Sequence, residues 1–140
     1  MIPPVNLDVL LMEGRKAPAD PSVIAAAEEK LGITFPDDFK AFLLQTDGYE
    51  GWIGENYVSI YNVTYISESQ QSYVEEGAPG FFQIGSDGGN EGFGYDTRSS
   101  PWRMFMMPMD GIEWEVAIPV GASFADFLAG ASVRNLIDLI

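Results

Sequence analysis

Residues 85–98, with the sequence GSDGGNEGFGYDTR, constrain the fold of this chain more than any other segment. Five of these fourteen residues are glycine, which permits tight turns and lets neighbouring backbone approach closely. Phe93 and Tyr95 alternate with Gly94 and Asp96, so a strand here places its aromatic rings on one face. Aromatic-rich segments typical of strands flank the stretch on both sides. The pattern therefore predicts a sharply turned hairpin within a sheet.

The flanking segments predict the rest of this sheet. Predicted strands cover residues 57–61, 81–85, 93–96, 103–109 and 113–120. In the last strand, alternation puts Trp114 on one face and both Glu113 and Glu115 on the other. Short connections between consecutive strands indicate an antiparallel meander. With helices packed around it, this arrangement predicts an α+β fold with a mostly antiparallel sheet of about four to six strands.

Two helices are predicted before the sheet and are expected to pack as a hairpin. Asp20 and Pro21 are typical of a helix start, and Gly32 is typical of its end. The second helix covers residues 36–46 and follows after only a few residues. Its apolar stripe consists of Phe35, Phe39, Phe42 and Leu43.

The remaining segments complete a single predicted domain over residues 1–140. Residues 1–19 form an N-terminal arm, for which the sequence leaves open either a packed segment or a helix. A surface helix is predicted within residues 62–76, with Val63, Ile66 and Tyr73 loosely spaced along it. Ser123 is expected to cap a closing helix, and Ser132 a last short one.

The charge of the chain restricts its partners. Seven basic residues against 21 acidic residues give a formal net charge of −14. Direct binding to nucleic acid is not expected, because phosphates would be repelled. A basic protein partner would instead be attracted, since complementary fields accelerate encounter. The alternative is that the acidity serves only solubility.

The chain contains neither cysteine nor histidine. It therefore lacks disulfides, thiol nucleophiles, the commonest general base and the commonest transition-metal ligand. No run reaches the length of a membrane-spanning helix, and residues 1–4 lack the features of a signal peptide. We expect a cytoplasmic protein without membrane contact.

The glycine-rich stretch itself admits several chemical interpretations. A phosphate-binding loop needs a following helix, whereas Gly92 to Tyr95 run into a strand-like segment, and nearby acids repel phosphate. Asp87, Asn90, Glu91 and Asp96 could supply oxygen ligands to calcium, but their spacing matches no EF-hand. Weak calcium binding stays open, and the alternative is that Asp87 and Asn90 shape the turn.

Catalysis is not expected. Among 21 acids some pair will meet the spacing of a glycosidase by chance, so that criterion discriminates little. Ser86, Ser99 and Ser100 have no histidine to activate them, and no lysine follows Lys40. We predict no enzyme activity, no catalytic residues, no cofactor and no metal.

Binding to a protein partner is the function that these residues favour. Trp52 and Trp102 are predicted in loops, where they either anchor an interface or close the edge of the core. Met104, Met106, Met107 and Met109 could line a partner groove, but core packing is the favoured interpretation. The candidate partner-binding residues are Trp52, Asp87, Glu91, Asp96, Trp102, Glu113 and Glu115.

Several motifs together resemble SMI1/KNR4-type domains of the SUKH superfamily. They are AEEKLGI at 27–33, FPDDFKAFL at 35–43, IGSDGGNEGFGYDTR at 84–98, FMMPM at 105–109 and SFADFL at 123–128. Their order and spacing agree with the family across about residues 20–130.

This resemblance implies an α+β domain that binds proteins. For bacterial members it implies an immunity protein that blocks a cognate toxin, often a nuclease with a basic surface. The alternative that it implies is a general scaffold or regulatory module without a toxin partner, as in related fungal proteins.

Overall fold

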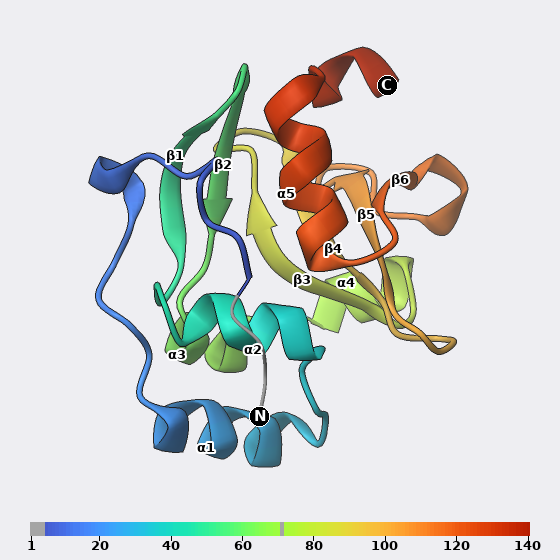
Figure 1. Ribbon diagram of the computed structural model, residues 1–140. Coiled ribbons are helices and arrows are strands. Elements are labelled where there is room, and N and C mark those ends of the chain that lie inside the picture. Colours follow the sequence, from blue (N-terminus) through green and yellow to red (C-terminus); the bar gives the residue numbers. More distant parts are fainter. Residues whose placement is uncertain (1–4, 71) are drawn as a thin grey trace.

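The protein folds around one antiparallel sheet of six strands, which lie side by side in the order in which they occur in the chain (Figure 1). The computed structural model describes residues 5–70 and 72–140. The strands are β1 (Tyr49–Ile53), β2 (Asn56–Ile60), β3 (Phe81–Ser86), β4 (Glu91–Asp96), β5 (Arg103–Pro108) and β6 (Ile118–Gly121). The predicted α+β class and the antiparallel meander are confirmed.

Five α-helices and three short 3₁₀ helices occur in these described ranges. The α-helices are α1 (Pro21–Leu31), α2 (Asp37–Leu43), α3 (Val63–Glu68), α4 (Ser72–Gly77) and α5 (Phe124–Val133). The 3₁₀ helices are η1 (Met12–Gly14), η2 (Trp114–Val116) and η3 (Leu136–Leu139). The single surface helix predicted over residues 62–76 is thus two short helices, and the side chain of Tyr73 lies outside the described part of the chain, as do residues 1–4.

Local capping signals explain where α1 begins and ends. The Asp20 carboxylate accepts a hydrogen bond from the Ser22 backbone N–H at 2.8 Å, and Gly32 closes the helix at φ 69°. The predicted α1–α2 hairpin is only partly right: Glu28 of α1 and Lys40 of α2 form an ion pair at 3.4 Å, but α1 packs mainly against α3 and α2 mainly against α5. The aromatic stripe of α2 explains this, since Phe39 and Phe42 contact Phe124 of α5 at centroid distances of 5.0 and 4.7 Å.

The sheet buries apolar side chains on both faces. The larger cluster lies between the sheet and the helices α2 and α5, and Phe93, Tyr95, Met104 and Met106 supply it from β4 and β5. The smaller cluster on the other face includes Met107 together with Val74 and Ala78 from the α4 region. Core packing of the methionines, the favoured interpretation, therefore agrees with the structure on both faces.

The glycines of β4 are required by close packing. A Cβ atom on Gly94 would lie 2.5 Å from the Phe82 carbonyl oxygen, and one on Gly92 would overlap the Met109 sulfur. Both glycines lie on the face opposite Phe93 and Tyr95, where side chains of neighbouring strands cross directly over the backbone. The predicted hairpin with close backbone approach is confirmed.

Of the strand predicted over residues 113–120, only the last part forms, because β6 begins at Ile118. Glu113 and Glu115 lie on the connection that contains η2, and only β6 joins the sheet. The Trp114 ring packs between Phe81 and Phe105, at 5.8 and 5.6 Å, and its indole N–H donates to the Pro79 carbonyl at 2.8 Å. These tertiary contacts hold the segment on the smaller core cluster and away from the sheet.

The two ends of the chain also differ in part from the predictions. In the N-terminal arm, Leu7 and Leu10 are buried, so the packed alternative describes it better than a continuous helix. Ser132 lies inside α5 and caps nothing; Asn135 caps η3 by accepting from the Ile137 N–H. The tip of the β1–β2 hairpin lies near the end of α5 (Figure 1), where the Asn56 amide donates to the Ala131 carbonyl at 2.7 Å.

Candidate protein-binding groove

A groove of about 290 Å³ lies between the β1–β2 hairpin and the turn that joins β3 to β4. It opens because β2 pairs with β3 only at Ser59↔Ser86 and Ile60↔Gly85, so the first half of β2 diverges from its neighbour. The groove is lined by Trp52, Glu55, Asn56, Tyr57, Asp87, Phe93, Met106, Asn135, Leu136 and Ile137.

The groove combines an apolar floor with an aromatic and acidic rim. Phe93, Met106 and Leu136 are almost fully buried, whereas Glu55 and Ile137 are exposed. Such a combination suits a protein side chain that buries apolar surface and carries positive charge.

Trp52 stands at the rim on a strand and is not in the predicted loop. It is 55% exposed and contacts its cross-strand partner Tyr57 edge-on, with ring centroids 5.6 Å apart. The Tyr57 ring in turn lies over Gly88, where an added Cβ atom would come within 2.9 Å of the ring. The position of this exposed aromatic pair therefore depends on a glycine of the neighbouring turn.

Asp87 shapes that turn. Its Oδ1 accepts hydrogen bonds from the Gly89 and Glu91 backbone N–H groups at 2.8 and 3.1 Å. Nearby, the Asn90 amide donates to the Asp110 carboxylate at 2.8 Å. The interpretation that Asp87 shapes the turn is thus supported by direct contacts, whereas the Asn90 side chain bonds Asp110 and not its own turn.

The carboxylates of the glycine-rich stretch do not converge on one point. Burial raises the pKa of the Glu91 carboxyl, and the negative charges of Asp87 and Asp110 act in the same direction. Asp96 lies at the opposite end of β4, where hydrogen bonds from the Arg98 side chain lower the pKa of the Asp96 carboxyl. Across residues 5–70 and 72–140, no group of three or more acidic side chains is arranged to hold a metal ion.

The remaining predicted residues lie away from the groove. Trp102 is half-buried against Tyr95 and Phe82, with centroid distances of 5.7 and 6.3 Å, which fits the interpretation that it closes the edge of the core. Glu113 and Glu115 are exposed on the η2 connection. The structure therefore brings Trp52 and Asp87 together and separates them from Asp96, Trp102, Glu113 and Glu115.

Of the ten residues that line the groove, only Trp52 and Asp87 are among the predicted partner-binding residues. Tyr57 was recognised only as part of a strand, and Glu55 and Ile137 were not singled out. The signal for Tyr57 was its register opposite Trp52, which becomes visible only when residues 49–53 are recognised as a strand. The position of Ile137 depends on the packing of the C-terminal segment and has no local signal.

The hydropathy of the helices and the similarity to a known protein add to this description. None of the helices in the described ranges has both the length and the hydropathy needed to span a bilayer. The chain is 38% identical over 85 residues to the uncharacterized protein YnaB of Bacillus subtilis (strain 168), an alignment that covers 57% of this chain and 59% of the relative. This chain therefore spans less than two thirds of that relative's length.

A family model agrees with the motifs and with the fold. The model of the SMI1 / KNR4 family (SUKH-1) matches residues 18–130, from just before α1 into the second half of α5. The match includes the glycine-rich turn and the β1–β2 hairpin. This chain belongs to the SMI1/KNR4 family (SUKH-1).

Proposed function

We propose that this protein is a non-catalytic binding domain that acts as an immunity protein and neutralises a toxin domain with a basic surface. The observation that supports this most is the groove at the hairpin, where exposed Trp52 stands beside Glu55 and Asp87 above an apolar floor. The immunity role itself is the one that the family resemblance implies for bacterial members.

The physical chemistry of the groove favours a protein ligand. Exposed tryptophans beside sheltered apolar surface are frequent anchors of interfaces, and their truncation commonly costs about 2 kcal/mol or more. The net charge of −14 favours rapid encounter with a positively charged partner, such as a toxin that binds nucleic acid.

The test is co-expression with the toxin domain encoded beside this chain, with survival of the cells and the Kd of the purified complex as readouts. Wild-type protein should protect the cells. Trp52→Ala should weaken the complex by about 30-fold or more. Asp87→Asn removes a charge while keeping an acceptor for the turn, and should weaken binding mainly at low salt. Glu29→Gln, on the exposed face of α1, is the matched charge control and should bind normally.

A double variant on a second surface tests whether the partner binds at the groove. Joint charge reversal of Glu113 and Glu115 alters acidity on the η2 connection without touching the groove. Loss of binding in that double variant, with normal binding by Trp52→Ala, would assign the interface to the η2 connection. The scaffold role would be favoured if the wild-type protein failed to protect cells from the toxin domain encoded beside it and instead captured a housekeeping complex. Turnover of a hydrolase substrate would refute the non-catalytic assignment.

A further inference from the structure

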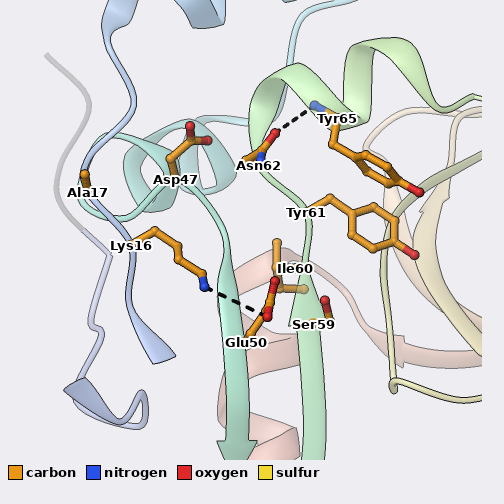
Figure 2. Close-up of a pocket in the computed structure, with 9 residues that line it drawn as sticks. All are labelled: Lys16, Ala17, Asp47, Glu50, Ser59, Ile60, Tyr61, Asn62 and Tyr65. Carbon is orange, nitrogen blue, oxygen red and sulfur yellow. Dashed lines mark hydrogen bonds and ion pairs between the residues drawn. The ribbon is translucent and has the colours of Figure 1, made fainter. Parts of the chain in front are cut away.

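A second and larger cavity, of about 560 Å³, lies at the other end of the β1–β2 hairpin (Figure 2). The N-terminal arm, the turn before β1, both hairpin strands and α3 contribute to it. It is lined by Lys16, Ala17, Asp47, Glu50, Ser59, Ile60, Tyr61, Asn62 and Tyr65. Its volume falls within the range of about 300–1,000 Å³ typical of specific ligand sites.

Two tyrosine rings form one wall of this cavity. Tyr61 and Tyr65 meet edge to face, with centroids 4.7 Å apart, and Figure 2 shows both rings on the side away from Lys16. Tyr61 accepts a hydrogen bond from the Gln83 amide at 3.3 Å. The first turn of α3 fixes Tyr65, because the Asn62 side chain accepts from its backbone N–H at 2.7 Å. The wall is therefore a positioned aromatic surface, and the Tyr65 side chain is about half exposed.

Charged side chains form the opposite wall. Figure 2 shows the side chains of Lys16 and Glu50 pointing toward each other. The Lys16 amine and the Glu50 carboxylate are 3.9 Å apart, and both side chains are exposed. Asp47 adds a second carboxylate, whose Oδ1 accepts from the Val63 backbone N–H at 2.9 Å. An exposed ion pair at this separation is weak, so a better cation can displace Lys16 from Glu50.

We propose that this cavity receives an arginine side chain of the protein partner. The proposal rests on the protein-binding function proposed above and names a residue type that the partner presents. Glu50 would accept the guanidinium in a two-pronged ion pair, and the half-exposed Tyr65 ring would face its plane, held in place by its edge-to-face contact with Tyr61. Arginine suits this site better than lysine, because its planar group both stacks on rings and matches the geometry of a carboxylate. Two carboxylates against one amine disfavour an anionic ligand.

The cavity and the groove belong to one surface of the hairpin. Glu50 and Trp52 are two residues apart on β1, and their partners Ser59 and Tyr57 are likewise two apart on β2. Residues with this spacing in a strand point to the same face, about 7 Å apart. One extended segment of a partner can therefore place an arginine against Glu50 and an apolar side chain near Trp52.

The test uses the purified full chain and the probe peptide acetyl-Gly-Arg-Gly-amide, followed by two-dimensional NMR of backbone amides. Saturable shifts should appear at Glu50, Ser59 and Tyr65. The same peptide with citrulline, which is neutral and nearly identical in shape, should bind at least about fivefold more weakly. Glu50→Gln and Tyr65→Leu should each weaken binding by about threefold or more.

Lys16 supplies a variant with the opposite expected sign. Lys16→Met removes the competing cation at an exposed position, so the arginine peptide should bind more tightly. Glu29→Gln is again the control and should leave the affinity unchanged. Any of three results would overturn the assignment: weaker peptide binding by Lys16→Met, equal binding of the arginine and citrulline peptides, or amide shifts confined to other parts of the chain. If the double variant Glu50→Gln with Tyr65→Leu still protects cells, the arginine site in this cavity is refuted, but the proposed immunity function is not.

Discussion

Asn56 joins the tip of the β1–β2 hairpin to the end of α5, and its removal should destabilise the protein strongly. Its side chain is buried, and the amide donates to the carbonyls of Ala131 and Arg134 at 2.7 and 2.8 Å. Its carbonyl oxygen accepts from the Leu136 backbone N–H at 2.8 Å. A single side chain thus satisfies three backbone groups that α5 and η3 would otherwise leave without partners.

The expected cost follows from these three bonds. A hydrogen bond contributes about 0.5–1.5 kcal/mol net, and a buried group left unsatisfied raises the cost toward about 1–3 kcal/mol. Asn56→Ala should therefore lower the free energy of unfolding by about 3–4 kcal/mol, with a fall in Tm of roughly 10 °C.

Urea denaturation with and without the substitution measures this cost through the midpoint and slope of the transition. The control is Asn62→Ala, which removes one exposed capping bond to the Tyr65 N–H and should cost about 1 kcal/mol. Hydrogen exchange at the Leu136 amide should accelerate in the Asn56 variant alone. A loss within about 0.5 kcal/mol of zero, with unchanged exchange, would refute the view that Asn56 joins these elements.

Two further predictions concern the glycine-rich stretch and its surroundings. In the same urea assay, Gly94→Ala should destabilise the protein by about 2 kcal/mol or more, because the added methyl group overpacks against the Phe82 carbonyl. Gly111→Ala is the control: its methyl group meets no atom within 4 Å, so this variant should be neutral or slightly stabilising. Burial raises the folded-state pKa of the Glu91 carboxyl above its ordinary value of 4.5. Between that pH and the raised pKa the native state binds more protons than the unfolded state, so this residue's contribution to stability is lost as the pH rises through the raised pKa. Glu91→Gln should remove that loss and gain stability relative to wild type as the pH increases from 4 to 7; parallel stability profiles for the two proteins would contradict this.

Features that depend on neighbouring residues in the sequence were predicted well. The ends of α1 follow from Asp20 and Gly32, whose effects act within one helical turn. The two faces of β4 follow from strict alternation of rings and glycines, because the glycines fit only the face where Met109 and Phe82 approach the backbone closely. Both signals are complete within a short segment.

Features that depend on distant contacts were not predictable in this way. Alternation in residues 113–120 suggested a strand, but contacts of Trp114 with Phe81 and Phe105 hold its first part on the smaller core cluster. Likewise, β1 is short and interrupted by Gly51, so Trp52 was assigned to a loop. The groove itself arises because β2 diverges from β3, and no local pattern encodes where two strands stop pairing.

The glycine-rich stretch and the proposed binding surface are adjacent but have different physical requirements. Asp87 is occupied by backbone N–H groups, and Gly88 must stay small beneath the Tyr57 ring at a φ of 82°. Substitutions there alter the backbone, and with it the position of the aromatic rim. Trp52 and Glu50 instead project from the hairpin into solvent, where substitutions commonly change stability by about 0.5 kcal/mol or less. The turn can therefore hold the hairpin in place while the exposed residues of the hairpin change to suit a different partner, which separates the fold from its binding specificity.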